Sequence, residues 1–178
     1  MANYNVQRGL TQNFEVYYNN AGSARWLGIG TVDLPEIVEK TVDISGVGLL
    51  GDVAMPAPSM FESMEATIHW RTIHEDLTIL SAPITHSLTL RSAQTNYDGA
   101  TGEVLTQAVK ILIQGLPKNT ALGKFEQASE TESETTLEVL YLKITVDGND
   151  LTEIDKFNYV RKVNGADYLT ATRSALAL

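Results

Sequence analysis

The residues of this chain that are best suited to chemistry are three histidines and a few paired carboxylates. A metal site would need His69, His74 and His86 to converge within a few ångströms of one another. We expect His69 at a strand end, His74 at a helix start and His86 at the start of another strand, with no His-x-x-x-His spacing and no cysteine. The pattern therefore predicts no metal site and no cofactor.

The paired carboxylates suggest a second kind of chemistry, acid–base hydrolysis. Glu62 with Glu65, or Asp147 with Asp150, could act as general acid and general base in a hydrolase built on a β-sandwich. Acid pairs in turns and on strand faces are mostly solvated, however, and the chain has no Gly-x-Ser-x-Gly elbow, phosphate-binding loop or dinucleotide fingerprint. We predict that the protein is not an enzyme and has no catalytic residue, and keep the carboxylate-dependent hydrolase as a remote alternative.

Composition and charge narrow the class of protein further. The chain has 178 residues, of which 43% are hydrophobic and 20% charged, as in one soluble globular domain. No apolar run approaches the ~20 residues that cross a bilayer, and the polar N-terminus lacks a secretory signal, so we expect no membrane anchor. The absence of cysteine excludes disulfides and thiolate chemistry. A net charge of −9 argues against a protein that grips nucleic acid.

Any functional side chains must be positioned by β-strands, because β-branched residues and turn residues recur at short intervals from residue 25 onward. Expected strands span 25–34, 36–44, 63–70, 87–97, 103–114, 124–129, 137–146 and 151–160. A short helix over 72–80, after the third strand, would cover a barrel end, and a C-terminal helix over 166–177 would pack on the outside through Leu169 and Leu176. The predicted fold is mainly β, an antiparallel β-barrel or sandwich.

The expected strands over 36–44 and 63–70 alternate between polar and apolar residues, which indicates that each strand buries one face. In the strand over 63–70 the apolar face holds Met64, Ala66, Ile68 and Trp70. The polar faces of the two strands hold Glu39, Thr41 and Asp43, and Ser63, Glu65 and Thr67.

The segment 45–59 between these two strands combines flexibility with apolar surface. Its glycines Gly46, Gly48 and Gly51 favour a loop, yet the loop carries five large apolar side chains: Val47, Leu49, Leu50, Val53 and Met55. A loop cannot bury so much apolar surface by itself. It therefore either contacts a partner or folds back over its own barrel.

The C-terminal residues 153–178 carry the most specific pattern of the chain. An acidic strand, an Asn-Gly turn and a short alanine-rich helix follow in compact order: Glu153, Ile154, Asp155, then Val163, Asn164, Gly165, Asp167, then Arg173, Ser174, Ala175, Leu176. This order resembles the C-terminus of the major tail tube proteins of contractile phage tails. Upstream, Leu34-Pro35, the Gly-rich loop and a strand ending at Arg71 extend the resemblance over nearly the whole chain.

The resemblance implies a single tail tube domain over 1–178, with an N-terminal arm over 1–24, an inter-ring loop over 45–59 and the C-terminal helix. Six subunits would close a shared β-barrel ring, and the rings would stack into a tube through which DNA passes without specific binding. The implied partners are further copies of the chain, the tail sheath protein, the tape measure protein, and the baseplate and tail terminator proteins. The protein would reside in the virion tail after assembly in the host cytoplasm. The tube of a phage-tail-like bacteriocin or of a contractile injection system is the alternative.

Within such a tube, we expect the two polar strand faces to line the lumen. Fixed carboxylates repel phosphates, and a Debye length of ~8 Å leaves this repulsion effective near the wall. The acidic run 126–138 has two readings: a solvated hairpin tip, or a rim that contacts a positively charged neighbour.

Overall fold

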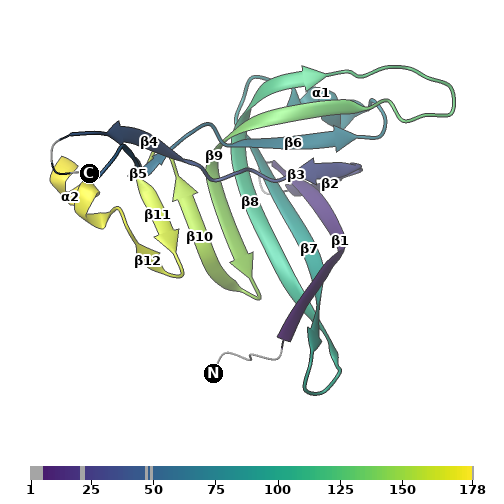
Figure 1. Cartoon of the computed structure of the whole chain (residues 1–178). Coiled ribbons are helices and arrows are strands. Elements are labelled where there is room, and N and C mark those ends of the chain that lie inside the picture. Colours follow the sequence, from purple (N-terminus) through teal and green to yellow (C-terminus); the bar gives the residue numbers. More distant parts are fainter. Residues whose placement is uncertain (1–5, 21–22, 47, 49, 178) are drawn as a thin grey trace.

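The computed structural model describes residues 6–20, 23–46, 48 and 50–177 (Figure 1). In chain order its elements are β1 Val6–Asn20, β2 Ser23–Leu27, β3 Thr31–Asp33, β4 Glu39–Ile44, β5 Val53–Phe61, β6 Glu65–Trp70, α1 Glu75–Leu80, β7 His86–Asp98, β8 Val104–Ala121, β9 Ser133–Val146, β10 Asn149–Asp155, β11 Val160–Val163, β12 Ala166–Asp167 and α2 Thr170–Leu176. The predicted mainly β fold with two short helices is confirmed.

Most of the strands form one antiparallel sheet, which we call the main sheet. Its strand order is β12-β11-β10-β9-β8-β7-β1-β2, and β6 joins it by pairing with β9 on one side and β3 on the other. Strands β4 and β5 pair only with each other, as a separate two-stranded hairpin. Within the described residues the main sheet is open, with β12 and β2 at the two ends of this strand order and β3 as a third edge on the β6 branch.

The main sheet bends sharply because β9 belongs to two layers. Its first half pairs with β6 and its second half with β10, while β8 follows it on the other side. The β8–β9 register shifts after Gln114 and again after Pro117, and such bulges bend a strand. Gly115 lies at the first shift, where a Cβ atom would stand only 2.5 Å from the carbonyl oxygen of Glu138. The close approach of the two strands therefore requires glycine.

The hydrophobic core fills the space inside this bend. The apolar face predicted for 63–70 is confirmed, because Met64, Ala66, Ile68 and Trp70 are all buried. They pack with Val16, Leu27, Leu77, Leu80, Leu88, Leu90, Ile113, Leu137, Val139, Leu142 and Ile154. Within the core the Trp70 indole N–H donates to the hydroxyl of Thr135 at 3.0 Å, which satisfies its polar atom.

Several sequence-based boundaries are wrong. Residues 6–20, predicted as part of an arm, form β1, which pairs with β7 along most of its length. The strand expected over 25–34 is divided into β2 and β3, and residues 124–129 form no strand. Strand β8 continues past Pro117, because the proline lies between two register shifts where a missing N–H is tolerated.

The two helices are shorter than expected. Helix α1 starts at Glu75 and buries Asp76, Leu77 and Leu80 against the core, which confirms the prediction of a helix that covers one end. No residue within α2 is buried, but Leu169, just before its first residue, is buried, whereas Leu176 is 53% exposed. The predicted apolar packing is therefore correct for Leu169 and wrong for Leu176. The helix is also held by Arg173, whose guanidinium donates to the Asp167 carboxylate at 2.6 Å and to the Tyr159 carbonyl oxygen at 2.7 Å.

Candidate assembly surfaces

The three histidines have separate structural roles. His86 is buried, with one ring nitrogen 3.2 Å from the Tyr18 hydroxyl and the other 3.0 Å from the Ala82 carbonyl oxygen. His69 lies 3.0 Å from the Asp33 carboxylate, and His74 packs edge-on against Trp70. Among the described residues, no three His, Asp or Glu side chains converge as metal ligands would.

One carboxylate of each pair considered for hydrolysis forms an ion pair with a lysine. Glu65 is paired with Lys118, and this hydrogen bond lowers the pKa of the Glu65 carboxyl. Asp150 is paired with Lys143 at 2.8 Å, and the Lys143 bond likewise lowers the pKa of Asp150. A general acid needs a raised pKa, so neither carboxyl is suited to donate a proton near neutral pH.

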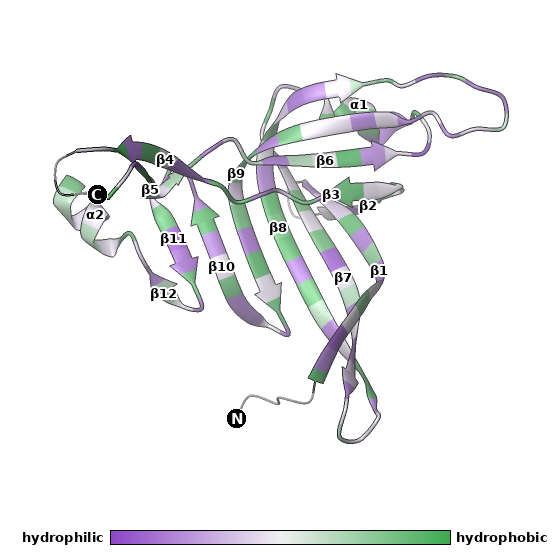
Figure 2. Cartoon of the chain, in the orientation of Figure 1, coloured by the Kyte–Doolittle hydropathy of each residue, from purple (hydrophilic) through white to green (hydrophobic). Residues whose placement is uncertain are grey.

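The β4–β5 hairpin presents an apolar surface that the described part of its own chain leaves uncovered. Val42 lies opposite Met55 and Ile44 opposite Val53, so these four side chains share one face of the hairpin. Their exposed fractions are 58%, 50%, 42% and 44%, and Leu50 at the tip is fully exposed. We call these four residues the apolar hairpin face; Figures 1 and 2 show the hairpin beyond the main sheet. Val47 and Leu49, also predicted for this loop, lie outside the described residues.

The base of this hairpin is fixed to β11. The Arg161 guanidinium pairs with the Glu39 carboxylate at 2.8 Å and lies 4.9 Å from the centre of the Phe61 ring, so it contacts both hairpin strands. Lys156, just after β10, donates to the carbonyl oxygen of Glu62 at 3.3 Å. The apolar hairpin face is therefore held in a defined direction, and only the tip of the predicted loop 45–59 is irregular.

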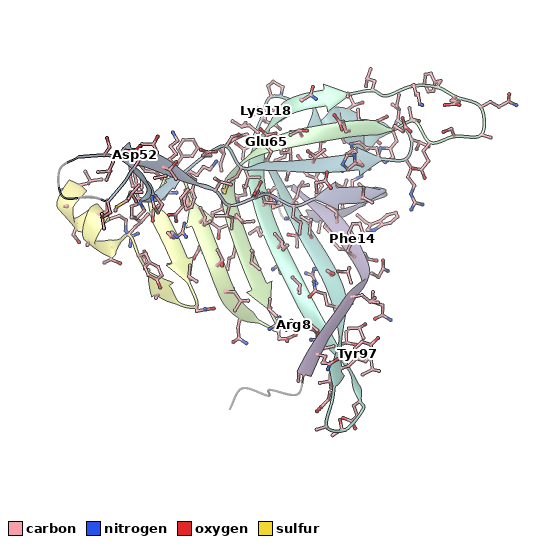
Figure 3. All side chains as sticks on the ribbon, viewed as in Figure 1. Arg8, Phe14, Asp52, Glu65, Tyr97 and Lys118 are labelled. Atoms are coloured by element: carbon pink, nitrogen blue, oxygen red, sulfur yellow. The ribbon has the colours of Figure 1, made fainter. Side chains whose placement is uncertain are left out.

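The six residues predicted to line a lumen are divided between two sheets. Three of them, Glu39, Thr41 and Asp43, lie on the separate hairpin, whereas Ser63, Glu65 and Thr67 lie on or beside β6 in the main sheet. Glu39 is paired with Arg161, Ser63 is bonded to Glu138, and Thr67 lies 3.1 Å from the Thr136 hydroxyl. Figure 3 shows Glu65 beside Lys118 and far from Asp52 at the hairpin tip. The two strand faces do not form one continuous surface, and their place in a lumen stays a prediction.

A larger polar surface, which the sequence analysis missed, covers the outer face of the main sheet. Its side chains are in register across the strands, in the row Tyr17, Thr89, Leu112, Lys143, Glu153, Lys162 and Asp167. Two of its lysines are paired across the strands, with Lys162 bonded to Glu153 at 3.0 Å and Lys143 to Asp150 at 2.8 Å. Arg91 and Lys110 lie opposite each other on the same face. The Tyr141 hydroxyl also donates to Glu153 at 2.9 Å, and burial together with this carboxylate raises the pKa of Tyr141 to about 12. We call this surface the polar sheet face.

The edges of the main sheet at β2 and β12 are further candidate assembly surfaces, and β3 forms a third edge on the β6 branch. In the described chain β2 pairs only with β1, and β12 pairs only with β11, so each leaves backbone groups unpaired on one side, over five residues in β2 and two in β12. Unpaired edges are templates for another strand. Figure 1 shows the β2 and β12 edges at opposite sides of the molecule.

Comparison with known proteins identifies the family. Residues 10–176 match the family described as phage tail tube protein FII. The chain belongs to this family. The tail tube protein of Escherichia phage P2 is 29% identical over 152 residues, which cover 83% of this chain and 86% of that protein. The major tail tube protein of Serratia phage KSP20 is 26% identical over 151 residues, which cover 84% of this chain and 86% of that protein.

Solved structures share the fold of this tail tube protein. A chain of the sheath/tube terminator of the extracellular contractile injection system PVC, in its extended state, superposes with a TM-score of 0.52 at 15% identity, covering 75% of this chain and 94% of that one. A chain of the anti-feeding prophage baseplate, whose structure was symmetrised sixfold, gives a TM-score of 0.50 at 11% identity. The match covers 79% of this chain and 95% of that chain.

The family assignment confirms the resemblance seen in the sequence: this is a major tail tube protein of the contractile-tail type, a component of the phage tail. The family is a structural one, which implies a role other than catalysis. Neither described helix has the length and the apolar character that a membrane span requires.

Proposed function

We propose that six copies of this tail tube protein close into a ring and that the rings stack into the inner tube of a contractile phage tail, around a channel through which DNA passes. The observation that carries this proposal is the open main sheet, with unpaired edges at β2 and β12 on opposite sides. Full closure of a sheet removes its edges, and one subunit does not close this one. Copies joined edge to edge would form a barrel shared by the ring.

The apolar hairpin face supports the stacking of rings. A two-stranded hairpin is at best marginally stable in water, so a hairpin with four half-exposed apolar side chains is better accounted for by a partner than by solvent. We propose that residues 45–59, with Val47, Leu49, Leu50, Val53 and Met55, reach the adjacent ring. The alternative, that the loop covers its own barrel, is disfavoured because the apolar hairpin face is exposed in the single subunit.

Two surfaces are candidates for the channel wall. The acidic set from the sequence analysis, Glu39, Thr41, Asp43, Ser63, Glu65 and Thr67, would repel phosphates, but two of its three carboxylates are already paired with cations. The polar sheet face is the second candidate, because it is the polar face of the very sheet that a ring would close. Its lysines Lys143 and Lys162 are paired with carboxylates, which reduces the attraction that they offer to DNA phosphates.

The cysteine-free sequence allows a direct test of the channel wall. Single cysteines at Thr145, on the polar sheet face, and at Thr67, on β6, would be placed in separately assembled tubes. A small maleimide should label both, whereas a large polymer-linked maleimide enters only through the tube ends and should label a wall cysteine slowly. Slow labelling at Thr67 alone would favour the acidic set, and slow labelling at Thr145 alone the polar sheet face. Fast labelling at both would contradict a closed channel.

The proposed partners of this protein are the other components of a contractile tail. They are the sheath around the tube, the tape measure protein, the terminator at one end and the baseplate at the other, with assembly in the host cytoplasm. The fold is shared with chains from a sheath/tube terminator and from a sixfold baseplate, which is consistent with these neighbours and with sixfold rings. Electron microscopy of the purified protein tests the core of the proposal. Hollow tubes built of sixfold rings are expected, and a compact monomer at high concentration would contradict it.

The same subunit could serve a phage-tail-like bacteriocin or another contractile injection system. The likeness in fold to chains of two injection systems favours keeping this second function in view. The two are separated by the surrounding genes, because a bacteriocin locus has no capsid and terminase genes.

A further inference from the structure

The connection between β8 and β9 is a loop that presents an exposed phenylalanine. Phe125 is 90% exposed and Leu122 is 59% exposed. We call residues 122–132 the Phe125 loop; it carries three glutamates and one lysine. Figure 1 shows it extending from the upper right of the molecule.

Internal contacts hold this loop in place. The backbone N–H of Lys124 donates to the Thr131 carbonyl oxygen at 2.9 Å. The backbone N–H of Thr131 donates to the Arg71 carbonyl oxygen, also at 2.9 Å. Gly123 has a φ of +70°, and a Cβ atom there would lie 1.9 Å from the Thr131 oxygen, so the crossing of the two limbs requires glycine. A phenylalanine held outward on an ordered loop loses little conformational entropy when it binds, which favours a role in recognition.

A groove of complementary character lies on the other side of the subunit. It has a volume of about 290 Å³ and lies between β5 and the start of β11. Apolar side chains line it, including Met60, Phe61, Tyr159 and Leu169, and Lys40 and Lys156 stand at its rim. Met60 and Tyr159 are 62% and 44% exposed, so the apolar lining is open to a ligand. We call it the lysine-rimmed groove.

The charge of the groove is opposite to that of the loop. The lining has two lysines against one carboxylate, Asp155, and the Phe125 loop has three glutamates against Lys124. Lys156 is itself paired with Glu138 at 2.9 Å, and Glu130 lies 3.7 Å from Arg71. Lys40 in the groove, and Glu126 with Glu132 around Lys124 in the loop, are therefore the charges that a neighbouring copy would meet. An apolar tip with an acidic surround fits an apolar groove with a basic rim.

We propose that the Phe125 loop of one copy seats in the lysine-rimmed groove of the next copy around the ring. The loop and the groove lie at opposite sides of the subunit, on the sides of the β2 and β12 edges respectively (Figure 1). A contact between two different patches is heterologous, and its repetition closes a ring when the rotation allows. This second contact rests on the proposed ring, and would join the same neighbours that the sheet edges join.

The direct test is crosslinking of assembled tubes, because the chain has no cysteine of its own. Gln127→Cys on the loop and Phe157→Cys beside the groove, in one chain, should give a ladder of covalent oligomers up to a whole ring with a short bismaleimide. Either single variant should give no ladder, and nor should Gln127→Cys combined with Thr101→Cys at the β7–β8 turn. Intact tubes of the double variant that yield only monomer would overturn the proposal.

Two further variants measure the contact itself. Phe125→Ala should raise the concentration needed for assembly about 30-fold or more, as truncation of a buried aromatic anchor does, whereas the control Ile84→Ala, at an apolar side chain that is 56% exposed, should not. Lys40→Glu should weaken assembly, and Glu126→Lys should restore it in the double variant. Normal assembly by Phe125→Ala while wild-type protein forms rings would refute this contact alone; wild-type protein that forms no rings would refute the proposed function instead.

Discussion

Replacing two cross-strand neighbours on the apolar hairpin face should uncouple the rings without unfolding the subunit. Val42 and Met55 lie opposite each other and are 58% and 50% exposed. Full burial of such a side chain contributes about 1.5–3 kcal/mol, so burial of the exposed half against a neighbouring ring would contribute ~1 kcal/mol each. The double variant Val42→Ser/Met55→Ser should therefore lose ~2 kcal/mol per subunit, or ~12 kcal/mol for the six contacts between two rings, before association and ordering costs.

The stability of the free subunit should change little, since both side chains are already half in water in the isolated chain. Thermal unfolding followed by circular dichroism checks that expectation. Sedimentation velocity and negative-stain microscopy then measure assembly, and we expect subunits or single rings at concentrations where the wild-type protein forms tubes.

A matched variant with serine at Ile73 and Ile84, which are 40% and 56% exposed outside the hairpin, controls for the loss of surface hydrophobicity. It should form tubes like the wild-type protein. Tubes of normal length from Val42→Ser/Met55→Ser, with an unchanged assembly concentration, would show that the apolar hairpin face does not join the rings.

The remaining predictions concern the single subunit. Arg161→Ala removes the contact that fixes the hairpin base and leaves Glu39 without its cation, so it should cost about 1–3 kcal/mol in urea unfolding and speed hydrogen exchange in β5; unchanged exchange would contradict the clamp. Gly115→Ala forces a Cβ atom to within 2.5 Å of a β9 carbonyl oxygen and should cost roughly 1–3 kcal/mol or more, whereas Gly28→Ala, whose Cβ would stand 3.6 Å from the nearest side-chain atom, should be tolerated. The hydrogen bond that Lys162 donates lowers the pKa of the Glu153 carboxyl in the folded state. Its stabilising contribution is then complete above the unfolded carboxyl pKa near ~4.3 and is lost as pH falls through the lower folded pKa. Thermal midpoints of Glu153→Gln should therefore depend less on pH below about 5 than those of the wild-type protein, and equal slopes would refute this assignment.

The sequence predicted best which face of a single strand is buried, and only where one face packs on the core and the other does not. The alternation in β6 identified its buried face correctly, because one face packs on the core and the other does not. The same reasoning failed for β1, whose first half is exposed on both faces and therefore shows no alternation. At α2 it was correct for Leu169, which is buried, and failed for Leu176, which is exposed while Arg173 holds the helix through Asp167.

Strand partnership was the main thing that pattern reasoning could not supply. The polar faces of β4 and β6 were identified, but β4 pairs with β5 and β6 pairs with β3 and β9. The partners of a strand are set by contacts distant in sequence, which a local period does not encode. The polar sheet face was missed for the same reason, because it exists only once seven strands are in register.

The pairing of β1 with β7 has a consequence for synthesis on the ribosome. Val6 pairs with Asp98, and at about 5–20 residues per second β1 must wait roughly 4–16 s after its own translation before its partner is complete. During that interval neighbouring nascent chains on one messenger RNA expose the same strand at high local concentration. The first half of β1 is rich in glutamine, arginine, threonine and asparagine, a composition that resists self-pairing. The polarity that hides β1 from pattern recognition thus keeps the growing polypeptide soluble until its partner emerges.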